Sequence, residues 1–257
     1  MQRPARSIRV FAATALLAVA CAAPLSPATA QQSALDRAAI EQIVKDYLMA
    51  HPEVLVESLN EFQKKQEAAE AEAQREALVS RQDELFKNPA SPVLGNPKGD
   101  VTLVEFFDPS CEACRAFHPV VQDIREQFPD QVRVVMRYAV FHEGSDEAVR
   151  ILETARMQDK FEPVLDALLE RQPEWAVHGA PRMDLAWQIA AAAGLDMEKA
   201  QTARLSPDIV GILNQDAADI AAIGVRQTPT FFLNGRQMRD ISMDSLLADV
   251  RSAVEAS

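Results

Sequence analysis

The sequence predicts an α/β fold that follows an all-α N-terminal region. Residues 33–87 carry a helical pattern. Two β-rich apolar runs, Val101–Phe107 and Val132–Tyr138, enclose a further helical pattern, which is typical of a strand–helix–strand unit with parallel strands. Between Ser145 and Ile223 only helical patterns occur, so we expect a helical insertion within the α/β part.

Residues 1–30 predict a secretory signal peptide. A cationic start and an apolar run precede small residues that end at Ala30, after which we expect cleavage. The apolar run is too short for a membrane span. Lipoprotein processing at Cys21 is an alternative, but the large aliphatic residue usually found three positions earlier is missing. We therefore expect a periplasmic protein.

The composition limits the partners of the chain. The 257 residues carry a formal net charge of −12, and loss of the signal-peptide arginines makes the mature chain more negative. An acidic surface argues against nucleic acid and anionic membrane as partners. The length suits one domain of ordinary size with an extension.

The pattern at residues 31–87 predicts a helical stalk. Ile40, Val44 and their neighbours form an apolar face, and a break at His51–Pro52 divides this part into two short amphipathic helices. From Gln63 to Phe86 the chain is rich in helix formers with little to bury. Such a helix is either a solvated connector or associates with copies of itself, and we expect self-association because the apolar faces have no other obvious target.

Residues 88–99 carry three prolines and two glycines and predict a linker before a domain at residues 100–257. Asn234–Gly235 predicts a tight hairpin turn. The expected strands are Val101–Phe107, Val132–Tyr138, Thr230–Leu233 and Arg236–Arg239, and the expected helices are Cys111–Phe128, Ser145–Met157, Phe161–Glu170, Asp184–Ala193, Met197–Ala203, Pro207–Ile223 and Met243–Val254.

The residues from Val101 to Cys114 carry the candidate chemistry. A strand and a turn lead into a CxxC motif at the start of a helix. A thiol there lies near unsatisfied N–H groups and the positive end of the helix dipole, which favour the thiolate. We therefore expect Cys111 to be the nucleophile and Cys114, one turn further on, to be the resolving thiol.

A half zinc site is the alternative reading of this motif. It needs two more ligands, and the sequence offers no second CxxC and only four scattered histidines. Once Cys21 leaves with the signal peptide, Cys111 and Cys114 are the only cysteines. An exported protein with this single pair has no structural disulfide elsewhere, so we expect a redox-active disulfide and no other cofactor.

Three features together resemble the thioredoxin-fold disulfide oxidoreductases of the DsbA family. They are the strand ending in CxxC, the helical insertion, and the segment T-P-T-F-F-L-N-G that starts at Thr228, and they cover Asn96 to Ser257. The resemblance implies a thioredoxin fold and a protein disulfide oxidoreductase or isomerase. Its partners would be exported cysteine-containing proteins and a membrane redox partner that resets the CxxC.

The N-terminal region has a second resemblance. Asp46-Tyr47-Leu48 followed by His51-Pro52-Glu53-Val54-Leu55 looks like the N-terminal region of the ScsC-like proteins, suppressors of copper sensitivity. In those proteins such a region drives trimerisation, so the resemblance implies a homo-oligomer, possibly a trimer. It also keeps open an alternative function, in which Cys111 and Cys114 bind Cu(I), a soft ion suited to thiolates.

The resemblance assigns roles to three more residues. Thr228–Pro229 matches the cis-proline position, which faces the CxxC and offers backbone groups to an extended substrate, although an ordinary trans proline is the alternative. Glu105 matches the buried acid beneath the active site. Its apolar neighbours would desolvate the carboxylate, raise its pKa and make its proton available to Cys114. A solvent-facing Glu105 on an edge strand is the alternative.

The dipeptide Glu112–Ala113 departs from the Pro-His or Gly-Tyr of better-known members. A histidine there stabilises the thiolate, whereas Glu112 places a negative group beside Cys111 and disfavours it. We therefore expect a weaker oxidant, suited to isomerase or reductase work, and Thr228 agrees by resemblance. Screening would shrink the effect if Glu112 points into water.

Overall fold

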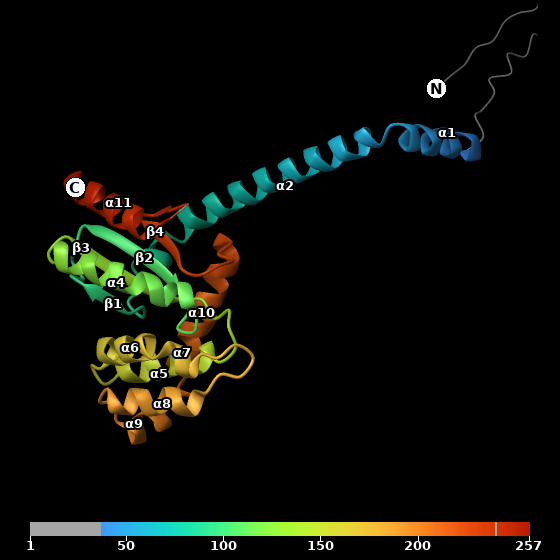
Figure 1. The fold of residues 1–257 in the computed structure, drawn as a ribbon. Coiled ribbons are helices and arrows are strands. Elements are labelled where there is room, and N and C mark those ends of the chain that lie inside the picture. The colour runs from blue at the N-terminus through green and yellow to red at the C-terminus, as the bar shows by residue number, and fades with distance from the viewer. Residues whose placement is uncertain (1–36, 240) are drawn as a thin grey trace, which may run out of the picture. The chain divides into compact units, whose positions relative to one another are not determined.

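The computed structural model describes residues 37–239 and 241–257 (Figure 1). The predicted signal peptide and Cys21 lie outside the described residues. The chain divides into two compact units, Met1–Leu59 and Asn60–Ser257. Among the described helices, none combines the length and the apolar character needed to cross a membrane.

The N-terminal helices meet at the predicted break. Helix α1 runs over Arg37–Ala50 and α2 over Pro52–Ser80, with Pro52 at the first helical position, where its missing N–H costs nothing. The second short helix that we expected is instead the start of α2, which has 29 residues. It continues because residues 53–80 hold no proline or glycine and are rich in good helix formers.

A five-stranded sheet forms the centre of the second unit. The strand order is β1-β3-β2-β4-β5, with β2 and β3 parallel and the other neighbours antiparallel. The strands are β1 (Val93–Gly95), β2 (Val101–Phe107), β3 (Val132–Tyr138), β4 (Thr230–Leu233) and β5 (Arg236–Gln237). The predicted bounds of β2, β3 and β4 are confirmed, whereas β5 is two residues shorter than expected.

Strand β1 lies inside the segment that we predicted as a linker. It pairs with β3, and Leu94 is buried at 2% exposure. The sequence conceals this strand because Pro92 precedes it and Gly95 ends it with a φ of 76°, and both residues read as loop signals. The stretch between the stalk and β2 is therefore partly integrated into the sheet.

Helices cover both faces of the sheet (Figure 1). One face packs against α4 (Glu112–Gln127) and α11 (Met243–Glu255), with side chains such as Leu103 between the layers. The other face packs against α3 (Gln82–Phe86) and α10 (Pro207–Ile223), with Phe106 among the buried side chains. Successive side chains of β2 point to opposite faces of the sheet, so the strand contributes to both apolar layers.

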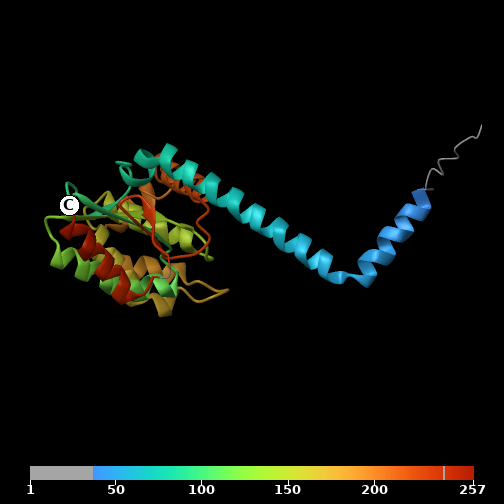
Figure 2. The ribbon, with the colours of Figure 1, turned by 90° about the horizontal axis from the view of Figure 1, so that it is seen from above.

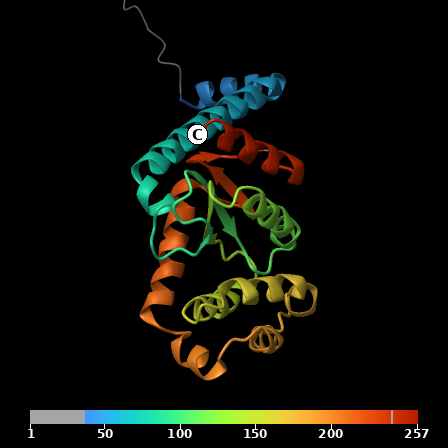
Figure 3. The same cartoon turned by 90° about the vertical axis from the view of Figure 1, so that its left-hand side faces the viewer.

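The predicted helical insertion is confirmed, and its helices α5, α6 and α8 contact one another. Its helices before α10 are α5 (Ser145–Arg156), α6 (Phe161–Glu170), α7 (Gln172–Trp175), α8 (Met183–Ala192) and α9 (Met197–Ala203). Helix α10 leads from this insertion back to the sheet (Figure 3). The predicted helix ends agree within one residue, but the four-residue α7 was not predicted.

The C-terminal part of the predicted stalk packs onto the sheet. Leu85 and Phe86 are buried in the apolar layer that also contains Ile223 of α10. The Arg81 guanidinium donates to the Asp219 carboxylate of α10 over 2.6 Å. Figure 2 shows this end of α2 beside α10. The end of the stalk therefore contributes to the core of the second unit.

Candidate active site

Cys111 lies where the chain turns from β2 into α4. It is the N-cap residue of α4, with φ −78° and ψ 122°, and its side chain lies at the N-terminus of that helix. The Cys111 N–H donates to the carbonyl oxygen of Asp108 over 3.0 Å. In its protonated form the Cys111 thiol donates to the carbonyl oxygen of Thr228 over 3.4 Å. The structure therefore brings the CxxC and the Thr228–Pro229 loop together.

The surroundings of Cys111 favour the thiolate. A side-chain hydrogen bond from Cys114 lowers the pKa of Cys111 to about 5, against the opposing effect of burial. A side-chain hydrogen bond from Thr228 and the backbone N–H groups of Cys114 and Ala113 lower this pKa further. The N–H contribution is the helix N-terminus effect that the sequence predicted. At neutral pH Cys111 is a thiolate and can act as a nucleophile.

Cys114 has the opposite character. Its side chain is 1% exposed, and burial raises its pKa far above the ordinary thiol value. The hydrogen bond to Cys111 and the charge of Glu105 raise this pKa further, while the backbone N–H of Asp108, 3.5 Å from the Cys114 sulfur, lowers it. Both thiols are free, and Cys114 stays protonated beside the Cys111 thiolate.

The peptide bond between Thr228 and Pro229 is cis, so an ordinary trans proline is excluded. The loop precedes β4, which pairs with β2 at the centre of the sheet. Thr230 fixes the end of the loop, because its hydroxyl donates to the carbonyl oxygen of Gln227 over 2.7 Å. The cis-proline loop thus lies beside Cys111, and its role in substrate binding is a prediction that follows from this placement.

Glu105 lies in the interior and not on a solvent-facing edge. It is 3% exposed on β2, which has β3 on one side and β4 on the other. Burial raises the pKa of the Glu105 carboxyl to about 8, and the charge of Cys111 adds to this shift. A carboxyl group of that pKa can hold or release a proton at neutral pH.

The Glu112 side chain points into water, which is the condition under which we expected its effect on Cys111 to shrink. The Glu112 side chain is 86% exposed and accepts a hydrogen bond from Arg115 over 3.2 Å. The causes of the Cys111 pKa shift do not include Glu112, and the shift is downward. Water and the Arg115 cation screen the carboxylate, so the dipeptide acts mainly through the Ala113 N–H.

Sequence reasoning missed two residues at this site, Asp108 and Gln172. The Asp108 carboxylate is fully buried and accepts hydrogen bonds from the backbone N–H groups of Ser110 (2.8 Å), Phe141 (2.8 Å) and His142 (3.0 Å), from the His142 ring (2.8 Å) and from the Ser145 hydroxyl. An aspartate directly after a buried strand was a usable signal, but we assigned it only to the turn. Gln172 offered no local signal.

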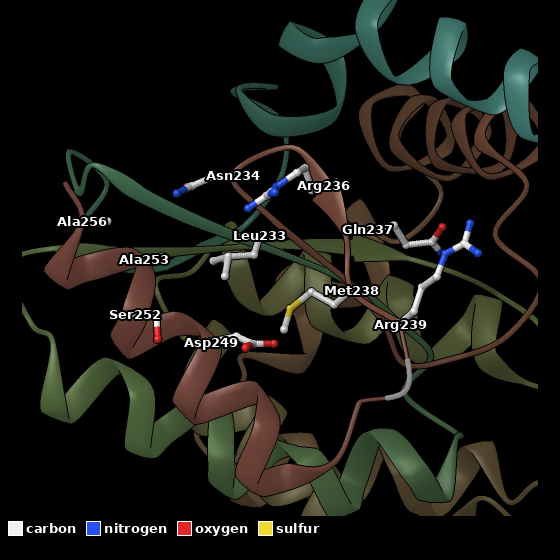
Figure 4. Close-up of a pocket in the computed structure, with 10 residues that line it drawn as sticks. All are labelled: Leu233, Asn234, Arg236, Gln237, Met238, Arg239, Asp249, Ser252, Ala253 and Ala256. Carbon is white, nitrogen blue, oxygen red and sulfur yellow. The ribbon is translucent and has the colours of Figure 1, made fainter.

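One hollow in the second unit is separate from the cysteines. A hollow of about 510 Å³ between β5 and α11 is lined by residues that include Met238, Arg239 and Asp249 (Figure 4), and none of them belongs to the CxxC or the cis-proline loop. Within residues 37–239 and 241–257, no three His, Cys, Asp or Glu side chains are arranged to hold a metal ion.

Comparison with known proteins gives two family matches and related structures. Residues 87–251 match the family described as thioredoxin, and residues 36–69 match the one described as copper resistance protein ScsC N-terminal domain. A thioredoxin-like oxidoreductase from Silicibacter pomeroyi DSS-3 is 34% identical, with a TM-score of 0.60 over 68% of this chain and 98% of that chain. Proteus mirabilis ScsC in a transitional conformation is 25% identical, with a TM-score of 0.60 over 85% of this chain and 96% of that chain.

One curated relative is much longer than this chain. The Na(+)/H(+) antiporter NhaA of Herminiimonas arsenicoxydans is 34% identical over 159 residues, which are 60% of this chain. The match covers 25% of that protein, so the chain spans about a quarter of its length. The name of this relative describes the longer protein and is not carried over to this chain.

Proposed function

The chain belongs to the thioredoxin family as an ScsC-like thioredoxin-fold oxidoreductase, and from this premise we propose a periplasmic enzyme that exchanges disulfides with exported proteins. The observation that carries the proposal is the pairing of two unlike thiols. The Cys111 thiolate, with a pKa of about 5, lies beside the cis-proline loop. The protonated Cys114 is buried next to the Cys111 thiolate.

Each group has a role in the exchange. The Cys111 thiolate attacks one sulfur of a substrate disulfide and forms a mixed disulfide, while the other substrate sulfur leaves as a thiolate. Cys114 then loses its proton and attacks the Cys111 sulfur, which releases the second substrate thiolate. The substrate disulfide gains two electrons and the CxxC becomes a disulfide; the reverse sequence oxidises a substrate dithiol.

Glu105 and the cis-proline loop assist this exchange. The deprotonated Glu105 carboxylate accepts the Cys114 proton as that thiol attacks, and a pKa of about 8 suits this transfer. Backbone groups at Thr228–Pro229 bind an extended substrate segment as an added strand and hold its sulfur near Cys111.

The direction of exchange that we propose is isomerisation of incorrect disulfides. Isomerisation requires that Cys111 both attacks and leaves again, and a low thiol pKa favours it as a leaving group. The Glu112 argument for a weak oxidant no longer holds, and a stabilised thiolate by itself raises the reduction potential. Thr228 supports isomerase work only through the family resemblance. A potential near about −120 mV, the DsbA value, together with no refolding of scrambled disulfides, would contradict this direction.

Two cysteine variants test the exchange itself. We expect Cys111→Ser to abolish insulin reduction and dithiol oxidation, because Ser offers no thiolate. We expect Cys114→Ser to accumulate mixed disulfides with substrate proteins, because the resolving attack is lost. Exchange activity that survives in Cys111→Ser would show that the assignment is wrong.

We also propose that the mature protein is a homo-oligomer, and the resemblance to the ScsC-like proteins suggests a trimer. The support is the exposed apolar surface of α1 and the start of α2, where Ile43 is 60% exposed and Phe62 58%. Light scattering of the full mature chain measures its mass. Truncation at Asn88 is a poor test because it removes Leu85 and Phe86 from the core.

Cu(I) binding is a second candidate function. It is favoured by the copper-resistance description of the N-terminal match and by two adjacent sulfurs, one of them a thiolate. Titration of the reduced protein with Cu(I) against a strong chelator, with Cys111→Ser as the control, tests it. Loss of the copper to the chelator at equal concentration would contradict a copper-handling role.

A further inference from the structure

Gln172 is a buried polar side chain whose side-chain hydrogen bonds all reach the CxxC region. It lies at the first position of α7 in the helical insertion and is 3% exposed. Its Nε2 group donates to the carbonyl oxygen of Pro109 over 2.8 Å and to that of Cys111 over 3.0 Å. Its Oε1 atom accepts a hydrogen bond from Arg115 Nε over 3.2 Å. One amide therefore contacts three points around Cys111.

The chemistry of these partners fixes the orientation of the amide. Arg115 offers only donors, so the oxygen of the Gln172 amide must face it. The two backbone carbonyls offer only acceptors, so the NH₂ group must face them. A flipped amide would place donor against donor and acceptor against acceptor, and a carboxylate at this position would repel both carbonyls.

The two carbonyls lie on either side of Ser110, at the turn from β2 into α4. A single NH₂ group that binds both of them restrains the path of the chain through this turn. The restraint acts directly on the backbone of Cys111, whose N-cap conformation places its sulfur near the N–H groups of Ala113 and Cys114. Without the amide, the Pro109 carbonyl would lose its hydrogen-bond donor in a buried place.

We propose that Gln172 is a positioning residue for Cys111, through which the helical insertion sets the geometry of the CxxC turn and so the thiolate fraction and the exchange equilibrium of the site. This inference rests on the proposed thiol–disulfide exchange. Gln172 touches no reacting sulfur, and its action passes through the Pro109 and Cys111 carbonyls.

The variant Gln172→Met tests the proposal in the full mature chain. Met fills a similar volume without donors, so the turn can relax and the Cys111 sulfur moves away from its N–H partners. We expect the pKa of Cys111, followed by thiolate absorbance, to rise by about one unit, which corresponds to about tenfold in the thiol–thiolate equilibrium. We expect the equilibrium constant with glutathione to shift by about tenfold toward the protein disulfide.

Gln158→Met is the matched control. Gln158 lies in the same insertion, and its amide donates to the carbonyl oxygen of Asp196 over 3.1 Å, away from the cysteines. We expect this variant to keep the wild-type Cys111 pKa and glutathione equilibrium. A folded Gln172→Met protein that also keeps both values within twofold would overturn the proposal, even if its melting temperature falls.

The wild-type protein supplies the readout if Gln172→Met does not fold. In NMR spectra we expect the side-chain NH₂ signals of Gln172 to exchange slowly with solvent and to shift as Cys111 titrates. Signals that exchange as fast as those of an exposed glutamine and do not respond to the titration would overturn the proposal. A wild-type protein that titrates at Cys111 but does not equilibrate with glutathione contradicts the proposed function instead, and the titration still decides the role of Gln172.

Discussion

The two units of this chain differ in the solvent exposure of their apolar side chains. Helix α1 has no buried residue, and Tyr47 on its apolar face is 54% exposed. Strand β2 has only Thr102 partly exposed, and Val104 is fully buried. Within the described residues of the first unit, helix α1 is therefore held by local helix propensity, whereas the second unit is held by a core that distant segments build together.

This difference indicates a division of work. A helix such as α1, which has no buried residue, gains stability by covering its apolar face with a partner. The CxxC needs a rigid scaffold, because its chemistry depends on the positions of N–H groups and of Thr228. We expect association to depend on the first unit and exchange to depend on the second.

The largest effect is expected on the apolar face of α1. The double variant Ile40→Asp, Val44→Asp places two charges where we propose contact between copies, and each buried side chain of this kind contributes roughly 1.5–3 kcal/mol per protomer. We expect the oligomer to dissociate in light scattering while the Cys111 pKa stays at its wild-type value. Gln42→Asp, on the polar face, is the control. A change in the Cys111 pKa would show that the units are not independent.

The next effect is expected in the core of the second unit. Phe106 is fully buried, 5.8 Å from the Phe232 ring centroid, and Phe106→Ala should lower the free energy of unfolding by about 3–5 kcal/mol. Urea denaturation followed by the fluorescence of Trp175 and Trp187 measures it. Glu57→Ala, in the first unit, should change this free energy by less than about 0.5 kcal/mol because Glu57 is exposed and lies outside the apolar face of α2. Equal losses in both variants would contradict the comparison.

A pH-dependent effect is expected at Glu105. The folded protein keeps the Glu105 proton up to a pKa of about 8, whereas the unfolded chain releases it near the ordinary value of 4.5. Folding stability therefore falls as the pH rises from 4.5 to 8, by up to ~5 kcal/mol from this group. We expect Glu105→Gln to remove this part of the slope in urea denaturation at several pH values. An unchanged slope would show that Glu105 titrates normally in the folded state.

The smallest effect is expected at Glu112. Its side chain is 86% exposed, so Glu112→His should shift the glutathione equilibrium by less than about threefold, as for a surface ion pair. This replaces the larger effect that the sequence alone suggested. A shift of tenfold or more would mean that the dipeptide tunes the site despite its exposure, and would restore the argument from Glu112 for a weak oxidant.

Patterns of short range led to correct predictions. The bounds of β2 and β3 were correct because β-branched and apolar runs end at turn residues. The Asn234–Gly235 hairpin was correct because both residues adopt positive φ, at 47° and 83°. The burial of Glu105 followed from its apolar neighbours and from the expected central strand. These features depend on residues that are close in sequence.

Features that depend on distant partners were missed. Strand β1 forms because it pairs with the edge of β3, about forty residues further along the chain. No residue between Pro92 and Gly95 indicates this pairing. The end of the stalk enters the core because Leu85 and Phe86 meet α10. The exposure of Glu112 could not be predicted because solvent exposure is a property of the folded surface.

The sequence by itself determined the α/β class and the CxxC at a helix start, because each rests on a local pattern with its own physical cause. The cis-proline position followed from the resemblance of Thr228–Pro229 to the DsbA family. Only the tertiary structure decided which polar groups surround the cysteines. Gln172 lies 61 positions after Cys111 in the sequence. Phe141 and Ser145, which bind Asp108, follow β3 and lie more than thirty positions after Asp108. The physical reason is that a hydrogen bond requires a partner within about 3 Å, and which distant groups come that close is set by the packing of the helical insertion against the sheet.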